Sequence, residues 1–244
     1  MEFADADGVV YAVRLGPVAV WRVGYRPDPW AWTDWSYARG GRFGGRWDSP
    51  DGGYRTIYAG SSLLACLVEV LAPFRPDPLV SEMQDGIRED DADRALHPTV
   101  APGFVDESWF AARRVGTAEL RGRWCDVAKA RTLSSLRPAF VAEAIGALGL
   151  EDFDASALQN SRPRALTQNV GRHLYERRSP SGDSAFDGIR FLSRHGEDLE
   201  LWAVFERADD PNVSGRLHEP VSAELPSTSP EVRAALMLHG LTTD

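Results

Sequence analysis

The chain has 244 residues, 43% of them hydrophobic, which is enough to build a folded core and excludes a disordered chain. Its formal net charge of −9 argues against a general nucleic-acid binder, because that function needs a basic surface to release counterions. A small anionic ligand remains compatible, since a few arginines focused in a cleft can bind it. No apolar run approaches membrane-span length, so we expect a cytoplasmic protein.

The first residues predict short strands followed by a loop. Two β-like runs, Val9 to Val13 and Val18 to Val23, are separated by a Gly-Pro step. Three tryptophans, Trp30, Trp32 and Trp35, then crowd a polar, Pro-rich stretch. We interpret this stretch as a loop anchored by aromatic rings.

A glycine-rich segment, a strand and a helix come next. Gly40 to Trp47 leads into strong turn residues, and Thr56 to Ala59 predicts a short strand. Ser61 or Ser62 can cap a helix from Leu63 to about Leu71. Four apolar residues at i, i+3, i+4 and i+7 predict its core face: Leu64, Leu67, Val68 and Leu71.

The second half of the chain mixes helical and strand patterns. Arg75 to Asp106 is acidic and weakly patterned, which indicates a surface excursion with one edge strand or helix. Ser108 to Asp126 predicts strands anchored by Trp109, Phe110, Val115 and Trp124. The remaining predicted elements are helices at Arg137 to Leu148 and Leu166 to Arg177, strands at Phe186 to Ser193 and Leu199 to Glu206, and a short helix near Pro230 to Leu241.

Helices and strands interleave without a regular βαβ period, which favours an α+β fold. We expect an N-terminal extension at 1–17, a main domain at 18–206 with an insertion around 75–160, and a C-terminal tail at 207–244.

Glu69 is the only charged residue between Tyr58 and Phe74. A helix this apolar is expected to be mostly buried, and a buried carboxylate is costly unless it is paired or hydrogen-bonded. Two interpretations of Glu69 follow. It is either a structural residue, which faces solvent on a thin polar stripe or pairs with an arginine, or it lies beside a ligand. In the second case it can bond a ribose hydroxyl or stabilise positive charge.

Arg42 and Arg46 lie four residues apart in the glycine-rich segment. Glycines allow the backbone to approach a ligand closely, and two arginines can form a fork around phosphate oxygens. The segment is neither a dinucleotide fingerprint nor a P-loop, and a hairpin loop with solvated arginines explains it equally well.

Tyr58, at the end of a strand, can stack on a planar ring, although a tyrosine of the core or its rim fits the same pattern. Ser193 at a strand end is, by itself, typical of a turn. The five histidines and two cysteines show no metal spacing, and no nucleophile motif is present, so we expect neither a metalloenzyme nor a serine or cysteine hydrolase.

Taken together, these segments resemble the RES family, named for its arginine, glutamate and serine. The segments that carry the resemblance are Trp21-Arg22-Val23, Gly44 to Asp48 with Pro50 and Gly52, Ile57-Tyr58-Ala59, Ser62 to Glu69, Asp187-Gly188-Ile189 and Ser193-Arg194. The order of the segments and the 11-residue step from Tyr58 to Glu69 are the specific features. The resemblance covers roughly Val18 to Glu206.

The resemblance implies an ADP-ribosyltransferase-like fold and an enzyme that consumes NAD⁺ by hydrolysis, phosphorolysis or ADP-ribosyl transfer. It also implies a bacterial toxin silenced by a helical Xre-type antitoxin, with no cofactor beyond NAD⁺ as substrate. Arg46 would hold phosphates or ribose, Tyr58 would stack near nicotinamide, Glu69 would be the catalytic carboxylate and Ser193 would line the pocket. Two further anion-binding candidates are Arg22 and Arg42.

Asp48-Ser49 stands where Asn-Pro is common in the family, and the region from Arg75 to Gln159 is longer than a compact toxin domain needs. Two alternatives to an enzyme are compatible with the sequence. One is a module that binds NAD⁺ or ADP-ribose without turning it over. The other is an interaction protein with a vestigial pocket. The sequence does not choose between water, phosphate and a protein side chain as the acceptor.

Overall fold

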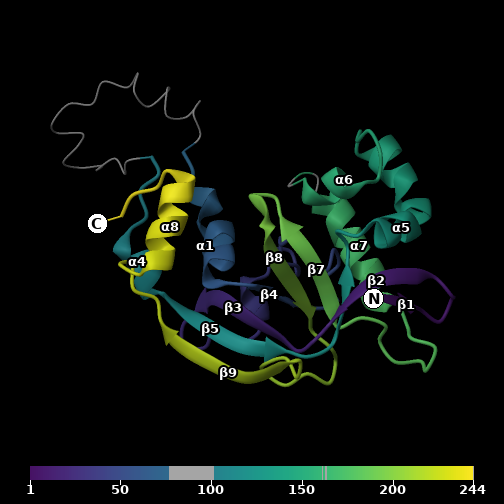
Figure 1. Ribbon diagram of the computed structural model, residues 1–244, viewed down its shortest axis with the longest axis horizontal. Coiled ribbons are helices and arrows are strands. Elements are labelled where there is room, and N and C mark those ends of the chain that lie inside the picture. Colours follow the sequence, from purple (N-terminus) through teal and green to yellow (C-terminus); the bar gives the residue numbers. More distant parts are fainter. Residues whose placement is uncertain (77–101, 161, 163, 244) are drawn as a thin grey trace.

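The structure, a computed structural model, describes residues 1–76, 102–160, 162 and 164–243. Its described part has an α+β fold built on one mixed sheet flanked by helices (Figure 1). The strands follow one another across the sheet in this order: β1 (Glu2–Ala4), β2 (Val10–Leu15), β6 (Arg123–Asp126), β7 (Gly188–Ser193), β8 (Gly196–Phe205), β4 (Thr56–Gly60), β3 (Val18–Tyr25), β5 (Arg113–Leu120) and β9 (Leu217–Glu224). Neighbouring strands are antiparallel except β6 and β7, which are parallel.

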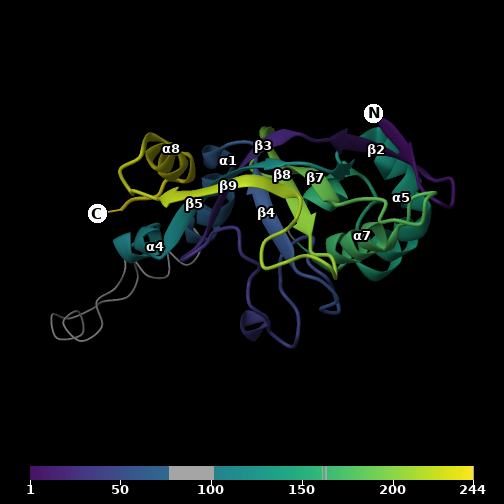
Figure 2. The same ribbon diagram turned by 90° about the horizontal axis from the view of Figure 1, so that it is seen from below.

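Two groups of helices lie at opposite ends of the sheet, with β7 and β8 between them (Figure 1). One group contains α1 (Leu63–Leu71) and α8 (Pro230–His239), which lie side by side in both views (Figures 1 and 2). The other contains α5 (Ala130–Ala142), α6 (Ala155–Gln159) and α7 (Arg164–Glu176). The short helix α4 (Glu107–Ala111) precedes β5, and single turns occur at Trp35–Tyr37, Ala72–Phe74 and Glu143–Ala147.

Alternation along the central strands divides the core between the two faces of the sheet. In β4, Ile57 and Ala59 pack with Trp30 and Trp32 of the aromatic loop in one buried cluster. Tyr58 points to the other face and packs against the cluster that includes the helices. The helix-covered face is therefore the one that receives Tyr58.

Most predicted elements are confirmed. The helix from Leu63 to Leu71 forms as predicted, and the Ser62 Oγ accepts a hydrogen bond from the Ala65 amide at 3.1 Å. The exception on its core face is Leu64, which is only half-buried. In the described ranges, no helix is long and apolar enough to cross a membrane.

Three predictions need correction. Trp109 and Phe110 lie in α4, not in a strand, because the Asp106 side chain accepts from the Ser108 amide and begins a helix there. The helix predicted from Arg137 begins at Ala130, where the buried Thr132 side chain accepts from the Ala12 amide of β2 at 3.1 Å. The third correction concerns three elements that the sequence analysis did not predict: β1, α6 and β9.

Strand β9 is almost fully exposed and lies in a tail rich in proline and serine, so no buried face distinguishes it. Its backbone pairing with β5 defines it instead. The strands of 1–17 and 207–244 pair within the same sheet as those of 18–206, and the proposed division of the chain stays a prediction. The excursion predicted at Arg75 to Asp106 lies largely outside the described residues, as does any edge element within it.

Candidate active site

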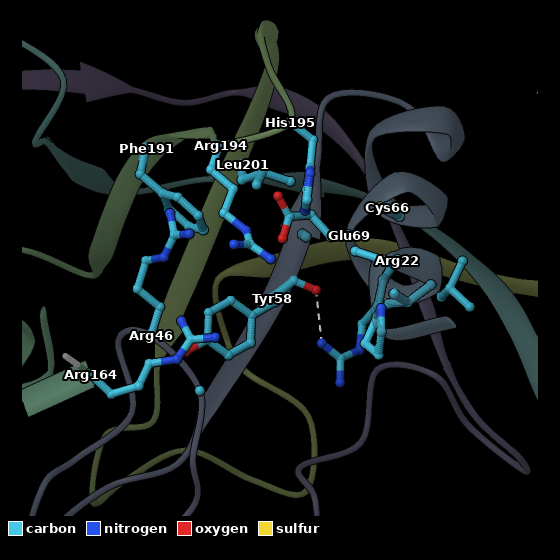
Figure 3. Close-up of a pocket in the computed structure, with 16 residues that line it drawn as sticks. Arg22, Arg46, Tyr58, Cys66, Glu69, Arg164, Phe191, Arg194, His195 and Leu201 are labelled. Carbon is cyan, nitrogen blue, oxygen red and sulfur yellow. Dashed lines mark hydrogen bonds between the residues drawn. The ribbon is translucent and has the colours of Figure 1, made fainter. Parts of the chain in front are cut away.

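A cleft of about 420 Å³ opens on the helix-covered face of the sheet (Figure 3). Strands β3, β4, β7 and β8, helix α1, the first residue of α7 and the glycine-rich loop all contribute to its wall. The side chains that line it include those of Arg22, Arg46, Tyr58, Glu69, Arg164, Phe191, Arg194 and His195. Its size falls in the range of small-molecule sites.

Among the residues that the structure describes, Glu69 is the one acidic side chain that lines the cleft. It lies in the last turn of α1, half-buried, and its Oε1 accepts a hydrogen bond from the Ser193 Oγ at 2.5 Å. The Ser193 Oγ in turn accepts from the His195 amide at 2.9 Å. This chain of two bonds fixes the carboxylate from the end of β7, 124 residues away in sequence. Ser193 itself is buried and is not among the residues that line the cleft.

Arg46 enters the cleft from the glycine-rich loop and is only 7% exposed. One Nη2 hydrogen bond to the Gln159 carbonyl, at 3.3 Å, and the Phe191 ring, 5.6 Å from the guanidinium carbon, hold the side chain. Burial lowers the pKa of Arg46 and the nearby Glu69 opposes this shift. Since an arginine remains charged in proteins, Arg46 presents a poorly solvated cation near a carboxylate.

Tyr58 is held in place by its hydroxyl group. The hydroxyl donates to the Asp48 Oδ1 at 2.9 Å and accepts from the Trp47 amide at 2.9 Å. Burial raises the pKa of Tyr58 well above its usual value, and burial also raises the pKa of Asp48. The phenol therefore remains neutral, and the two bonds fix the ring at the cleft wall together with the loop that carries Arg46.

Arg22 lines the cleft, and two of its N–H groups donate to backbone carbonyls. Its Nε donates to the Pro29 carbonyl at 2.6 Å and its Nη1 to the Tyr58 carbonyl at 2.8 Å, as the dashed line in Figure 3 marks. Burial lowers the pKa of Arg22. These contacts tie the aromatic loop to β4, so Arg22 anchors the wall of the cleft.

Arg42 does not reach the cleft. It is exposed beside a separate hollow with Tyr37, Arg39 and Phe43, and its Nη1 donates to the Pro50 carbonyl at 3.2 Å. Although Arg42 and Arg46 are four residues apart in the sequence, they line two different hollows, so their side chains do not meet in the cleft.

Sequence reasoning gave no role to three basic residues of the cleft, Arg164, Arg194 and His195, although Arg194 lies in a segment that carries the family resemblance. Arg164 is the first residue of α7, and nothing in its local pattern distinguishes it from other surface arginines. Arg194 and His195 directly follow Ser193 in the turn between β7 and β8, and this adjacency was the available signal. Figure 3 shows Arg46, Arg164 and Arg194 grouped on one side of the cavity, facing Glu69 and His195.

The charge of the cleft is opposite to that of the whole chain. Four arginines line it against one carboxylate, whereas the chain carries a net −9. A concentration of guanidinium groups in a partly buried site favours a ligand with phosphate groups. Within the described ranges, no cluster of three or more histidine, cysteine or acidic residues has a geometry suited to a metal ion.

Comparison with known proteins places the chain in a family. The RES domain matches residues 19–224. The chain belongs to the RES domain family. The matched range contains Arg22, Arg46, Tyr58, Glu69 and Ser193, and it ends before α8.

Among solved structures, the chain is similar to one described as the crystal structure of the M. tuberculosis MbcT–MbcA toxin–antitoxin complex. The two share 17% sequence identity with a TM-score of 0.46, over 93% of this chain and 92% of the other. No curated protein matches the chain.

Proposed function

We propose that this RES domain protein consumes NAD⁺ by cleaving the bond between nicotinamide and ribose. One observation carries the proposal: Glu69 is a hydrogen-bonded carboxylate in a cleft whose other charged groups, among the described residues, are arginines. A dinucleotide needs cations for its pyrophosphate, and cleavage at its cationic end needs one anion beside the reacting ribose.

In this proposal the arginines bind and Glu69 assists the reaction. Arg46, Arg164 and Arg194 hold the pyrophosphate oxygens, and binding fixes the ribose beside the carboxylate. The C1′–N bond then breaks, its electron pair leaves with nicotinamide as a neutral molecule, and positive charge develops on the ribose. Glu69 stabilises that charge, as a carboxylate does in glycoside cleavage. The acceptor oxygen bonds to C1′ and its proton is released.

In this proposal Ser193 and Tyr58 position other groups and do not react themselves. The Ser193 Oγ holds one carboxylate oxygen of Glu69 and leaves the other available to face the substrate. The Tyr58 ring, fixed through its hydroxyl, offers a planar surface for nicotinamide.

Incubation of the purified protein with NAD⁺, with and without inorganic phosphate, tests the proposal. Mass spectrometry identifies the products: nicotinamide with ADP-ribose for hydrolysis, nicotinamide with a phosphorylated ADP-ribose for phosphorolysis, or ADP-ribose on protein for transfer. Binding of NAD⁺ without release of nicotinamide supports the alternative of a binding module. No binding at all supports a vestigial pocket, and either result refutes the enzyme.

We also propose that the protein is the toxin of a bacterial toxin–antitoxin pair, as the RES family resemblance implies. Depletion of NAD⁺ would stop growth, and a helical Xre-type antitoxin would silence it. Induced expression in a bacterial host tests this, with growth and cellular NAD⁺ as readouts. The wild-type chain should arrest growth while Glu69→Gln at equal abundance should not.

A further inference from the structure

Helix α8 lies beyond the range that the RES domain matches, yet it packs directly on α1 (Figures 1 and 2). The Ser229 side chain begins the helix by accepting from the Val232 amide at 3.3 Å, and Gly240, with φ of 65°, ends it. Its inner face is buried and includes His239, whereas Met237 and Leu238 are exposed. The packing brings an ionisable side chain to the helix that carries Glu69.

His239 contacts the backbone immediately before Glu69. Its Nε2 lies 2.7 Å from the Val68 carbonyl oxygen. A carbonyl only accepts, so the Nε2 carries the hydrogen. Val68 lies in the last turn of α1, and a carbonyl oxygen has two lone pairs, so it can accept from a side chain in addition to a helical amide. The imidazole therefore ties the end of α1 to α8 through a side-chain hydrogen bond.

The same imidazole packs against His195 at the cleft wall. The two ring centres are 5.4 Å apart with their planes at 81°. The His195 Nδ1 lies 3.4 Å from Arg75 Nη1 and must accept, since a guanidinium only donates. Burial lowers the pKa of His195, which Glu69 opposes, so at neutral pH the ring is uncharged with its hydrogen on Nε2. Figure 3 shows this ring beside the Glu69 carboxylate.

We propose that α8 is a functional part of the cleft and that His239 is a positioning residue, which fixes the backbone of Glu69 and the ring of His195 together. The inference rests on the proposed function where it treats Glu69 as the catalytic carboxylate. His239 does not line the cleft, so it acts through these two neighbours alone. Reacting groups must be held to within a fraction of an ångström, and a displacement of about 1 Å can cost ~10²-fold in rate.

Three variants separate positioning from general stability. His239→Leu removes the donor and the ring but keeps an apolar side chain on the buried face. His239→Gln retains an amide N–H at the distance of the imidazole Nε2. Met237→Ala, at a residue of the same helix that is 79% exposed, is the matched control. Each is assayed well below its melting temperature for kcat and KM with NAD⁺, and for amide hydrogen exchange over residues 63–74.

We expect His239→Leu to lower kcat by ~10- to 10²-fold with KM changed by less than about twofold, because substrate contacts are intact. Exchange in 63–74 should accelerate in the same variant. His239→Gln should recover most of the kcat and the protection, and Met237→Ala should match wild type. A His239→Leu enzyme with wild-type kcat overturns the inference, as does a kcat loss that Gln fails to rescue.

The exchange measurement does not depend on turnover. If the wild-type protein fails to cleave NAD⁺, the proposed function falls, and the exchange data still decide whether His239 holds the end of α1. Unchanged exchange in His239→Leu refutes the positioning role whatever the activity.

Discussion

Replacement of Glu69 by glutamine is the sharpest test of the proposed chemistry. The amide keeps the size of the side chain and can still accept the hydrogen bond from the Ser193 Oγ. What it loses is the negative charge. A unit positive charge about 4 Å from the carboxylate is stabilised by about 4 kcal/mol at an effective dielectric constant of ~20. Charge development is incomplete in the transition state, so we expect about 2.7–4 kcal/mol, or ~10²–10³-fold in kcat.

NAD⁺ affinity should change little in Glu69→Gln, because most of that positive charge on the ribose is absent in the bound ground state. Release of nicotinamide measures turnover, calorimetry measures affinity, and thermal denaturation measures stability. Glu151→Gln, at an exposed glutamate outside the cleft, is the charge-matched control. A Glu69→Gln enzyme with normal turnover refutes the mechanism. A loss of turnover that follows the loss of thermal stability makes Glu69 a structural residue.

Arg46→Ala should weaken NAD⁺ binding far more than it lowers kcat, because the phosphate charge is the same in the ground state and the transition state. Arg42→Ala, outside the cleft, should bind NAD⁺ normally. Equal losses of affinity in a titration of the two variants would contradict the assignment of the cleft as the NAD⁺ site. Wild-type affinity should fall as salt rises, and a flat salt series would argue against arginine–phosphate contacts. Tyr58→Phe removes the donor to the Asp48 Oδ1 and the acceptor of the Trp47 amide, so it should cost about 1–3 kcal/mol in urea unfolding. Tyr37→Phe, at a residue 75% exposed, should be neutral, and equal values would contradict the network. Burial lowers the pKa of His173 to about 4, so the free energy of unfolding should fall as pH drops from 6.5 to 4, and His173→Gln should flatten that slope; a parallel slope would exclude His173 as the cause.

Local sequence patterns predicted the elements whose signals are local. Ser62 caps α1 because a hydroxyl satisfies an amide of the first turn, and the apolar spacing that follows selects a helix. The strand at Thr56 to Ala59 follows from its composition, bounded by turn residues. The pattern failed at β9, where long-range pairing with β5 and not side-chain alternation makes the strand.

The sequence by itself predicted the α+β class. Through the order of its family motifs, it also predicted that Arg46, Tyr58 and Glu69 lie in one site. Only the tertiary structure decided which arginines join them. Arg42 and Arg164 are chemically identical side chains, yet the turn of the glycine-rich loop directs the first away from the cleft and the packing of α7 brings the second to it. His239 and Val68 are 171 residues apart in the sequence. No local pattern predicts their contact, because the contact forms only when α8 packs on α1.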